Sequence, residues 1–220
     1  MNSEWSAAIE RVGLRLSQRE LRTVGVISPI AHAGVTTFCE ALSEQRNISG
    51  HATLLITVAD PAAASGGRES VHDVLFSGDI ISDVRGYDRL LMPPEADLLR
   101  RFSSVRDTRE ALMRHMSSYH LIVLDLPPLA HCASSLSLCA ACDSVFLVCP
   151  IGISKGLVES TVTMLLQDGV NIGAIIWNDV EGASSTSQFS RFVKRWVPFR
   201  FPGRSNTHHS SEVSSLGSPR

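Results

Sequence analysis

Five short apolar runs alternate with segments of helical periodicity, and this alternation constrains the fold more than any other feature of the sequence. The runs are "TVGVIS" (23–28), "ATLLITVA" (52–59), "HLIVLDL" (120–126), "SVFLVCP" (144–150) and "IGAIIWN" (172–178). Each is almost continuous in apolar residues, which is typical of strands buried on both faces. The pattern predicts a three-layer α/β fold with a mostly parallel central sheet and helices on both faces.

Helical periodicity occurs in three segments between the runs, 36–47, 108–118 and 156–169. It also occurs at the N-terminus, where residues 1–20 predict a separate amphipathic helix. That helix would place Trp5, Ala8, Ile9, Val12 and Leu16 on one face. Segment 60–110 has no clear period, and we interpret it as short helices and connecting loops.

The chain divides into three parts by composition. The N-terminal helix (1–20) precedes an α/β domain over 21–202. The tail 203–220, "GRSNTHHSSEVSSLGSPR", is rich in Ser, His and Gly and almost free of apolar residues. Such a segment cannot bury enough apolar surface to fold, so we predict that it is disordered.

Bulk composition excludes several classes of protein. The 220 residues are 44% hydrophobic and 19% charged, with a net charge of -2. This balance gives no global attraction to nucleic acid, and we expect none as a partner. No apolar run approaches the ~20 residues that span a bilayer. Charges are spread over the first 20 residues, unlike a secretory signal, so we expect a cytoplasmic protein.

The cysteines suggest buried side chains more than a metal site. Three of them form a Cys-x6-Cys-x2-Cys pattern over Cys132, Cys139 and Cys142, next to His131. This segment lacks a second clean pair of ligands, and Cys142 lies beside a predicted strand. We therefore interpret these cysteines as small apolar residues of the core.

The segment "SPIAHAGVTT" (28–37) has the layout of a phosphate-binding loop. It joins an apolar run to a helical segment and ends in Gly-x-Thr-Thr. In an open parallel sheet, ligands bind beyond the carboxyl ends of the strands, where this loop lies. Gly34 lets backbone N–H groups approach phosphates, and Thr36 is of the type that holds magnesium. However, Val35 stands where such a loop carries its lysine.

The loop carries more side chain than a phosphate loop usually has, and no lysine lies nearby in the sequence. His32 and Ala33 stand where a phosphate loop usually has little or no side chain. The only lysines of the chain are Lys155 and Lys194. Loss of one preorganised donor from an active site typically costs ~3–4 kcal/mol of transition-state stabilisation. Catalysis is therefore disfavoured, although backbone N–H groups and the helix dipole can still hold a phosphate weakly.

A candidate metal-binding carboxylate is Asp125, in "YHLIVLDLPP" (119–128). An Asp that ends an apolar strand is typical of the Walker B position, which organises magnesium through water. The alternative is that Asp125 only caps the following turn. At the end of the run 52–59, Asp60 is the only comparable carboxylate.

These segments, in this order, resemble the cytoplasmic domain of bacterial tyrosine kinases (BY-kinases), within the MinD/ParA-like deviant-Walker-A P-loop ATPases. The resemblance covers about residues 20–180. It is carried by "ISPIAHAGVTT", "LLITVAD", "SVHDVLFSG", "YHLIVLDLPP", "CDSVFLVCPIGIS" and "GAIIWNDV". No single motif is decisive, but six occur in the family's order. The resemblance implies a P-loop NTPase-like domain over 21–202.

The departures from the family point to a degenerate member. Val35 replaces the P-loop lysine, and the two aspartates of the family's "LLIDxD" fall on Thr57 and Ala59, with Asp60 one position late. The C-terminal tyrosine cluster is absent, since the only tyrosines are Tyr87 and Tyr119. The ring-forming Glu-x-x-Arg-x-x-Arg motif is also absent, so the resemblance leaves homo-oligomer formation open.

By resemblance, any bound cofactor is ATP or ADP with Mg. Its binding residues would be Gly34, Thr36, Thr37 and Asn178, the last at the base-recognition position. Magnesium would be held by Thr36 and Asp125. No residue is assigned as catalytic, and Asp125 and Asp60 are remnants of the family's catalytic carboxylates.

The resemblance also implies a partner and a place in the cell. The chain would be a non-catalytic subunit at the inner face of the cell membrane, docked on the cytoplasmic part of a polysaccharide co-polymerase. It would support exopolysaccharide synthesis or export. Two alternatives stay open: an active ATPase or tyrosine autokinase with a rearranged site, and a MinD/ParA-like positioning ATPase.

The segment 190–204, "SRFVKRWVPFRFPGR", interleaves basic and aromatic residues. Such a stretch can touch an anionic membrane surface, which makes peripheral association an open hypothesis. We favour the alternative that Phe192 and Trp196 pack a last helix on the sheet while the charges are solvated.

Overall fold

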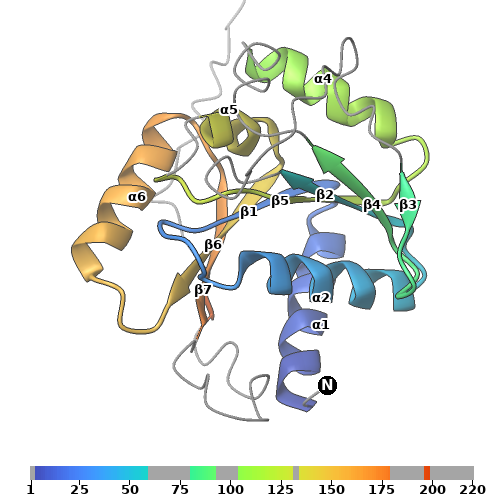
Figure 1. Ribbon diagram of the computed structural model, residues 1–220, viewed down its shortest axis with the longest axis horizontal. Coiled ribbons are helices and arrows are strands. Elements are labelled where there is room, and N and C mark those ends of the chain that lie inside the picture. Colours follow the sequence, from blue (N-terminus) through green and yellow to red (C-terminus); the bar gives the residue numbers. More distant parts are fainter. Residues whose placement is uncertain (1–2, 59–79, 93–103, 131–133, 179–195, 199–220) are drawn as a thin grey trace, which may run out of the picture.

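A computed structural model describes residues 3–58, 80–92, 104–130, 134–178 and 196–198. Its centre is one eight-stranded sheet with the strand order β3-β4-β2-β5-β1-β6-β7-β8 (Figure 1). The strands are β1 (Thr23–Ile27), β2 (Thr53–Val58), β3 (Ile81–Ser82), β4 (Asp88–Met92), β5 (Leu121–Asp125), β6 (Ser144–Pro150), β7 (Ile172–Asn178) and β8 (Trp196–Pro198).

The six inner strands, from β4 to β7, are parallel, and the edge strands β3 and β8 are antiparallel to their neighbours. The five apolar runs of the sequence are β1, β2, β5, β6 and β7, each within one or two residues of its predicted bounds. Strands β1 and β5 are buried at every residue, as expected when helices cover both faces. The predicted α/β fold class is confirmed.

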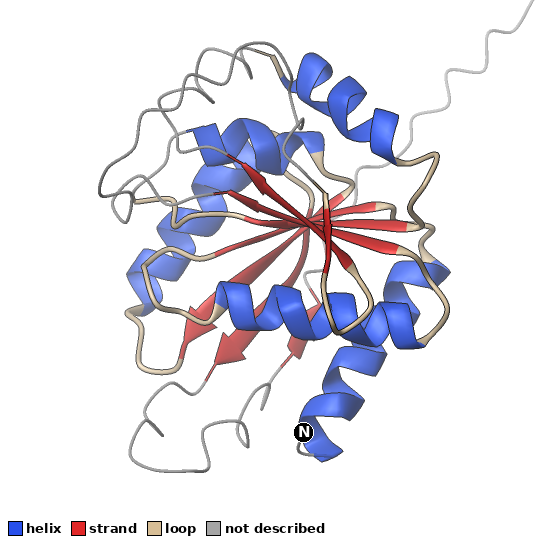
Figure 2. Cartoon of the chain, turned by 45° about the vertical axis from the view of Figure 1, so that its right-hand side comes forward, coloured by secondary structure: helices blue, strands red, loops and turns tan. Residues whose placement is uncertain are grey.

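Five described helices form the two outer layers (Figures 1 and 2). They are α1 (Ser3–Gln18), α2 (Val35–Ile48), α4 (Val105–His115), α5 (Ser134–Ala141) and α6 (Lys155–Gln167). Helices α1 and α2 cover one face, where Leu16 and Phe38 join a core with Val24 and Val123. Helices α4, α5 and α6 cover the other face, with Leu112, Leu138 and Leu165 in a second core.

Helix α1 belongs to the same core as the sheet and packs against α2. The side chain of Arg46, on α2, is only 8% exposed and donates from Nη1 to the carbonyl oxygen of Gly13 at 3.1 Å. A Cβ atom at Gly13 would lie 3.2 Å from Cδ of Arg46, so glycine gives the arginine room to cross α1. The N-terminal segment therefore folds onto the domain that follows it.

The structure corrects the expectations for two segments. The irregular segment 60–110 contains strands β3 and β4 and the start of α4. Strand β4 escaped the sequence pattern because it is only partly covered, and Leu91 within it is 68% exposed. Trp196 lies in strand β8, which pairs with β7 through Ile176, so the expectation of a helix at Trp196 was wrong.

Several expectations lie outside the described residues. These are Asp60, Cys132, the segment 190–195 and the tail 203–220. Over the part of the chain that the structure describes, no helix is both long and apolar enough to cross a membrane.

Candidate functional site

The candidate site lies at the carboxyl ends of the central strands, where the loop Ser28–Gly34 leaves β1 and enters α2. In the sheet register, Asp125 at the end of β5 pairs with Val26 of β1 and with Thr57 of β2. These ends meet because β5 lies between β1 and β2. The structure thus places the phosphate-loop-like segment beside Asp125, as the sequence predicted.

The loop keeps a backbone conformation that favours glycine at two positions. His32 has a φ of 58° and Gly34 a φ of 90°, both in the left-handed region. Few side chains adopt this region without strain, although His is among those that enter it more often. His32 therefore occupies a glycine-favouring position, in agreement with the expectation that this loop usually carries little side chain there.

Helix α2 begins with an open N-terminus. Gly34 is its N-cap and offers no side-chain hydrogen bond to the first N–H groups, and the first turn contains no acidic residue. The helix dipole and the free N–H groups favour a negative charge at such an end. Thr36 is exposed in this first turn and Thr37 is half-buried. Both lie where the sequence placed phosphate and magnesium contacts.

Val35 occupies the position of the missing lysine, and its side chain packs partly buried against the core under α2. The same core contains Ala33 and Phe38. Val35 therefore contributes apolar contacts to the fold and no charge to the loop. The valine is a structural residue at a position where a phosphate loop usually has its cation.

Asp125 is 4% exposed, and its environment favours the protonated form. Burial raises the pKa of its carboxyl group to about 6. A hydrogen bond from the Thr36 hydroxyl lowers this pKa. The negative charge of Glu40 raises it further, and the positive charge of Arg89 lowers it. Thr36 therefore lies near enough to Asp125 to lower its pKa, and the role of both residues as magnesium ligands stays a prediction.

The end of strand β2 offers no carboxylate within the described residues. Thr57 stands beside Asp125 in the sheet, and its hydroxyl oxygen is buried with no hydrogen-bond partner among the described groups. A buried polar atom without a partner costs free energy, so such atoms often mark a bound water or ligand. Asp60, the other candidate, lies outside the described residues.

Asn178 connects the end of β7 to the loop. It is 2% exposed, and its Nδ2 donates to the carbonyl oxygen of Ala33 at 2.8 Å. Its Oδ1 is buried with no hydrogen-bond partner in the described part of the chain. Asn178 thus holds the loop backbone and leaves one acceptor unused. Its role in base recognition stays a prediction.

A charged cluster beside the site was not predicted from the sequence. Glu40 of α2 accepts from Arg85 at 3.2 Å and from Arg89 at 3.1 Å, and Asp83 accepts from both arginines. Arg89 lies on β4, which the sequence pattern missed. The positive charge of Arg89 lowers the pKa of Asp125. Its guanidinium group forms ion pairs with Glu40 and Asp83.

Both tyrosines are engaged in the fold. Tyr87 is 1% exposed, and burial raises its pKa to about 12. The Tyr119 hydroxyl donates to Asp88 at 2.8 Å, and its pKa is raised to about 12, mainly by partial burial. Neither hydroxyl group is presented for phosphorylation in this conformation.

The described cysteines lie inside the protein, as the sequence suggested. Cys39, Cys139, Cys142 and Cys149 are all buried. Burial raises the pKa values of Cys39, Cys142 and Cys149 above the usual range, so these three thiols are poor nucleophiles. Within the described ranges, no three His, Cys, Asp or Glu side chains form a metal-binding group.

The residues present fit a Mg-nucleotide only in part. The open end of α2 suits a phosphate group, and the neighbouring Thr36 and Asp125 are of the types that bind magnesium. The loop itself supplies no lysine or arginine. Val35 stands at the position of the lysine and packs, partly buried, against the core. Within the described residues, the end of α2 therefore offers backbone groups to an anion, and the loop 28–34 itself adds no lysine or arginine.

Solved structures with the same architecture are P-loop proteins. The kinase domain of the Escherichia coli tyrosine kinase ETK is 21% identical, with a TM-score of 0.63 over 82% of this chain and 78% of that chain. The VpsO kinase domain is 23% identical, with a TM-score of 0.62 over 80% and 94%. The Aquifex aeolicus cell division protein MinD is 14% identical, with a TM-score of 0.52 over 71% and 68%.

The comparisons define a class of fold. The chain has the fold shared by BY-kinase domains and MinD-like P-loop ATPases, and this agrees with the resemblance seen in its motifs. At these identities the likeness concerns the fold alone. No protein-family model and no curated protein sequence matches the chain.

Proposed function

We propose that the protein is a degenerate, non-catalytic BY-kinase-like subunit that docks on the cytoplasmic part of a membrane polysaccharide co-polymerase. In this role it supports exopolysaccharide synthesis or export from the inner face of the membrane. The fold shared with tyrosine kinase domains and the six motifs in family order support the class.

One observation carries the non-catalytic part of the proposal. The loop keeps its left-handed backbone positions and the open end of α2, while Val35 packs into the core where the loop's cation belongs. A lysine at this position would neutralise phosphate charge, and its loss removes a large part of the catalytic effect. The burial of Tyr87 and the hydrogen bond of the Tyr119 hydroxyl to Asp88 support the same conclusion.

Calorimetric titration with Mg-ADP and Mg-ATP tests the state of the site. We expect no binding in the micromolar range and no hydrolysis of ATP. Micromolar binding would contradict a non-functional site. Autophosphorylation on either tyrosine, followed by mass spectrometry, would instead support the alternative of a rearranged autokinase.

Co-purification tests the partner. The full chain is expressed with a membrane polysaccharide co-polymerase from the same organism and is purified through a tag on the co-polymerase. We expect association that does not depend on added nucleotide. Recruitment to membranes that requires ATP and is lost when 190–204 is deleted would favour the MinD/ParA-like positioning ATPase, whose fold the chain also shares.

A further inference from the structure

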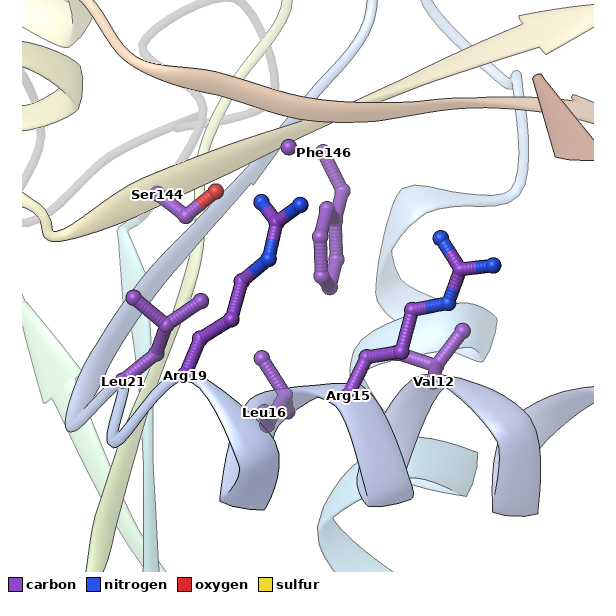
Figure 3. A pocket seen from close by; sticks show the side chains of 8 residues that line it. Val12, Arg15, Leu16, Arg19, Leu21, Ser144 and Phe146 are labelled. Carbon is purple, nitrogen blue, oxygen red and sulfur yellow. The ribbon is translucent and has the colours of Figure 1, made fainter. Parts of the chain in front are cut away.

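A small pocket lies far from the phosphate-loop edge, between the last turns of α1 and the first residues of β6 and β7 (Figure 3). Eight residues line it, and they come from α1, from Leu21, and from the starts of the two strands. The pocket is therefore at the amino-terminal edge of the sheet, on the face that α1 and α2 cover. Nothing in the proposed nucleotide chemistry uses it.

The floor of the pocket is apolar and closely packed. Phe146 is 5% exposed, and its ring meets Phe38 edge-on with the centroids 6.2 Å apart. A Cβ atom at Gly173 would lie 2.3 Å from Oγ of Ser144 and 2.9 Å from Cε1 of Phe146. Any side chain at Gly173 would displace this floor, so the pocket depends on a glycine there.

The mouth of the pocket is positively charged. Arg15 lies on α1 and Arg19 in the turn directly after it, and the backbone N–H of Arg19 donates to the carbonyl oxygen of Arg15 at 3.1 Å, so the two residues lie on the same side. Their guanidinium groups stand on either side of the Phe146 ring (Figure 3). None of the eight lining residues is acidic, and Arg19 is exposed to solvent. The pocket thus combines two cations with a hydrophobic floor and the Ser144 hydroxyl.

This combination fits a carboxylate on a short apolar stem. The cavity volume is about 20 Å³, enough for a small group and far below the several hundred Å³ of a nucleotide pocket. A guanidinium group binds a carboxylate through paired N–H donors, which gives both charge and geometry. We propose that the pocket binds a glutamate or aspartate side chain of a partner protein, with its methylene group on the Phe146 ring.

The partner in question is the one of the proposed function, so the inference rests on that function for the identity of its ligand. It adds where the partner binds and by what chemistry: an acidic segment docks beside α1, with Arg19 as its main contact. The nucleotide edge takes no part in this contact, since it lies at the opposite ends of the strands.

The test uses the isotope-labelled full chain and a synthetic probe, the peptide acetyl-Gly-Ser-Leu-Glu-Ser-Gly-amide. Its matched control replaces Glu with Gln. We expect amide NMR shifts at Ser144, Phe146 and Gly173 with millimolar affinity, and at least tenfold weaker binding of the Gln peptide. Absence of shifts at these residues, or equal binding of the two peptides, would overturn the proposal.

Two charge-reversal variants distinguish binding in the pocket from a general electrostatic attraction of the peptide to the protein. Arg19→Glu should weaken binding of the Glu peptide at least tenfold. Arg11→Glu changes the net charge equally on an exposed position of α1 outside the pocket and should leave binding within twofold. Equal losses in both variants would overturn the proposal. A matching loss of binding to phosphatidylglycerol vesicles in both would assign the surface to membrane instead.

The failure of this proposal is distinguishable from failure of the proposed function. If the peptide binds but the co-polymerase does not co-purify, the pocket stands and the partner is wrong. If the co-polymerase co-purifies equally with wild type and with Arg19→Glu, the pocket is not the docking site. Unchanged thermal unfolding of each variant confirms that the fold is intact.

Discussion

At the amino-terminal edge of the sheet, the polar groups around Asp143 are hydrogen-bonded to one another. Its Oδ2 accepts from the backbone N–H groups of Arg22 and Thr23, each at 2.9 Å. Its own N–H donates to the Thr23 hydroxyl at 2.9 Å, and its carbonyl oxygen accepts from Asn171 at 2.6 Å. These bonds join the starts of β1, β6 and β7.

At the carboxyl edge, by contrast, buried polar groups are only partly used. Asn178 leaves its Oδ1 and Thr57 its hydroxyl oxygen without a partner among the described residues, and Asp125 has a pKa of about 6 because it is buried. The comparison teaches that the bonds around Asp143 fasten the starts of three strands, while the carboxyl edge carries a destabilising arrangement typical of a ligand-binding edge. Five substitutions test this difference.

The largest effect is expected at the amino-terminal edge. Asp143→Ala removes the acceptor of two backbone N–H groups and should lower the free energy of unfolding by about 2–3 kcal/mol. Urea unfolding measures this loss. Asp168→Ala, at an exposed position after α6, is the control and should change stability by less than about 0.5 kcal/mol. Equal effects would remove the basis for the comparison.

At the carboxyl edge, Asp125→Asn should stabilise the protein by about 2 kcal/mol at pH 8. The folded-state pKa of about 6 exceeds the ordinary value of 3.8 for an aspartate, so burial of the carboxylate costs stability above pH 6. Wild-type stability should therefore fall as the pH rises from about 4 to about 6, relative to Asp125→Asn. The two proteins should become equal below pH 4, where the carboxyl group is protonated in both states.

Thermal unfolding across this pH range measures the difference. Asp168→Asn serves as the exposed control, for which we expect a difference that does not change over the same range. A destabilised Asp125→Asn at pH 8 would mean that the carboxylate is held by favourable contacts, and that the carboxyl edge fastens the fold as well.

Val35→Lys tests whether charge is what the carboxyl edge lacks. The aliphatic stem of lysine can keep part of the packing of valine while its ammonium group reaches the loop. Affinity for Mg-ADP should rise about tenfold, equivalent to about 1.4 kcal/mol. Val35→Met is the uncharged control and should leave the affinity unchanged. Calorimetry measures both, and an unchanged affinity of Val35→Lys would show that missing charge at this position is not what limits binding.

The smallest effect concerns the two non-glycine residues with positive φ, one at each edge. Glu20 has a φ of 53° in the turn before β1, and His32 has 58° in the loop after it. Glycine relieves about 1 kcal/mol of strain at such a position but loses about half of this in conformational entropy. His32→Gly and Glu20→Gly should each stabilise by about 0.5 kcal/mol in urea unfolding.

Only His32→Gly should also change the affinity for Mg-ADP, because only His32 lies in the loop. An equal change for Glu20→Gly would mean that stability alone controls binding. No change for either would show that the side chain of His32 does not obstruct the edge.

Much of the fold could be predicted from local patterns. Strands β1, β2, β5, β6 and β7 are apolar runs because both faces are covered, and α2 and α6 follow from helical spacing. Strand β4 was missed because it is half-exposed, and α5 because its small residues have no clear period. The two edge strands are too short for any pattern to emerge.

The candidate site also contains residues that could be predicted from the sequence and contacts that could not. Gly34, Thr36 and Asp125 could be predicted because their spacing relative to strand ends is a local property. The contact of Arg89 with Glu40 could not, because it depends on the position of a strand that the pattern did not reveal. The inward packing of Val35 also required the structure, since half of the surface of a helix faces the core.

By itself, the sequence determined the alternation of strands and helices and the chemical identity of each group, including the valine in place of a lysine. The alternation follows from periodicity, which depends only on residues that are close in the sequence. The chemical groups are given directly by the residue types. The tertiary structure alone decided that Asn178 holds Ala33 across 145 residues of sequence, and that Arg89 pairs with Glu40. Such contacts follow from the order of strands in the sheet, which brings distant strand ends together and buries their polar groups in one place.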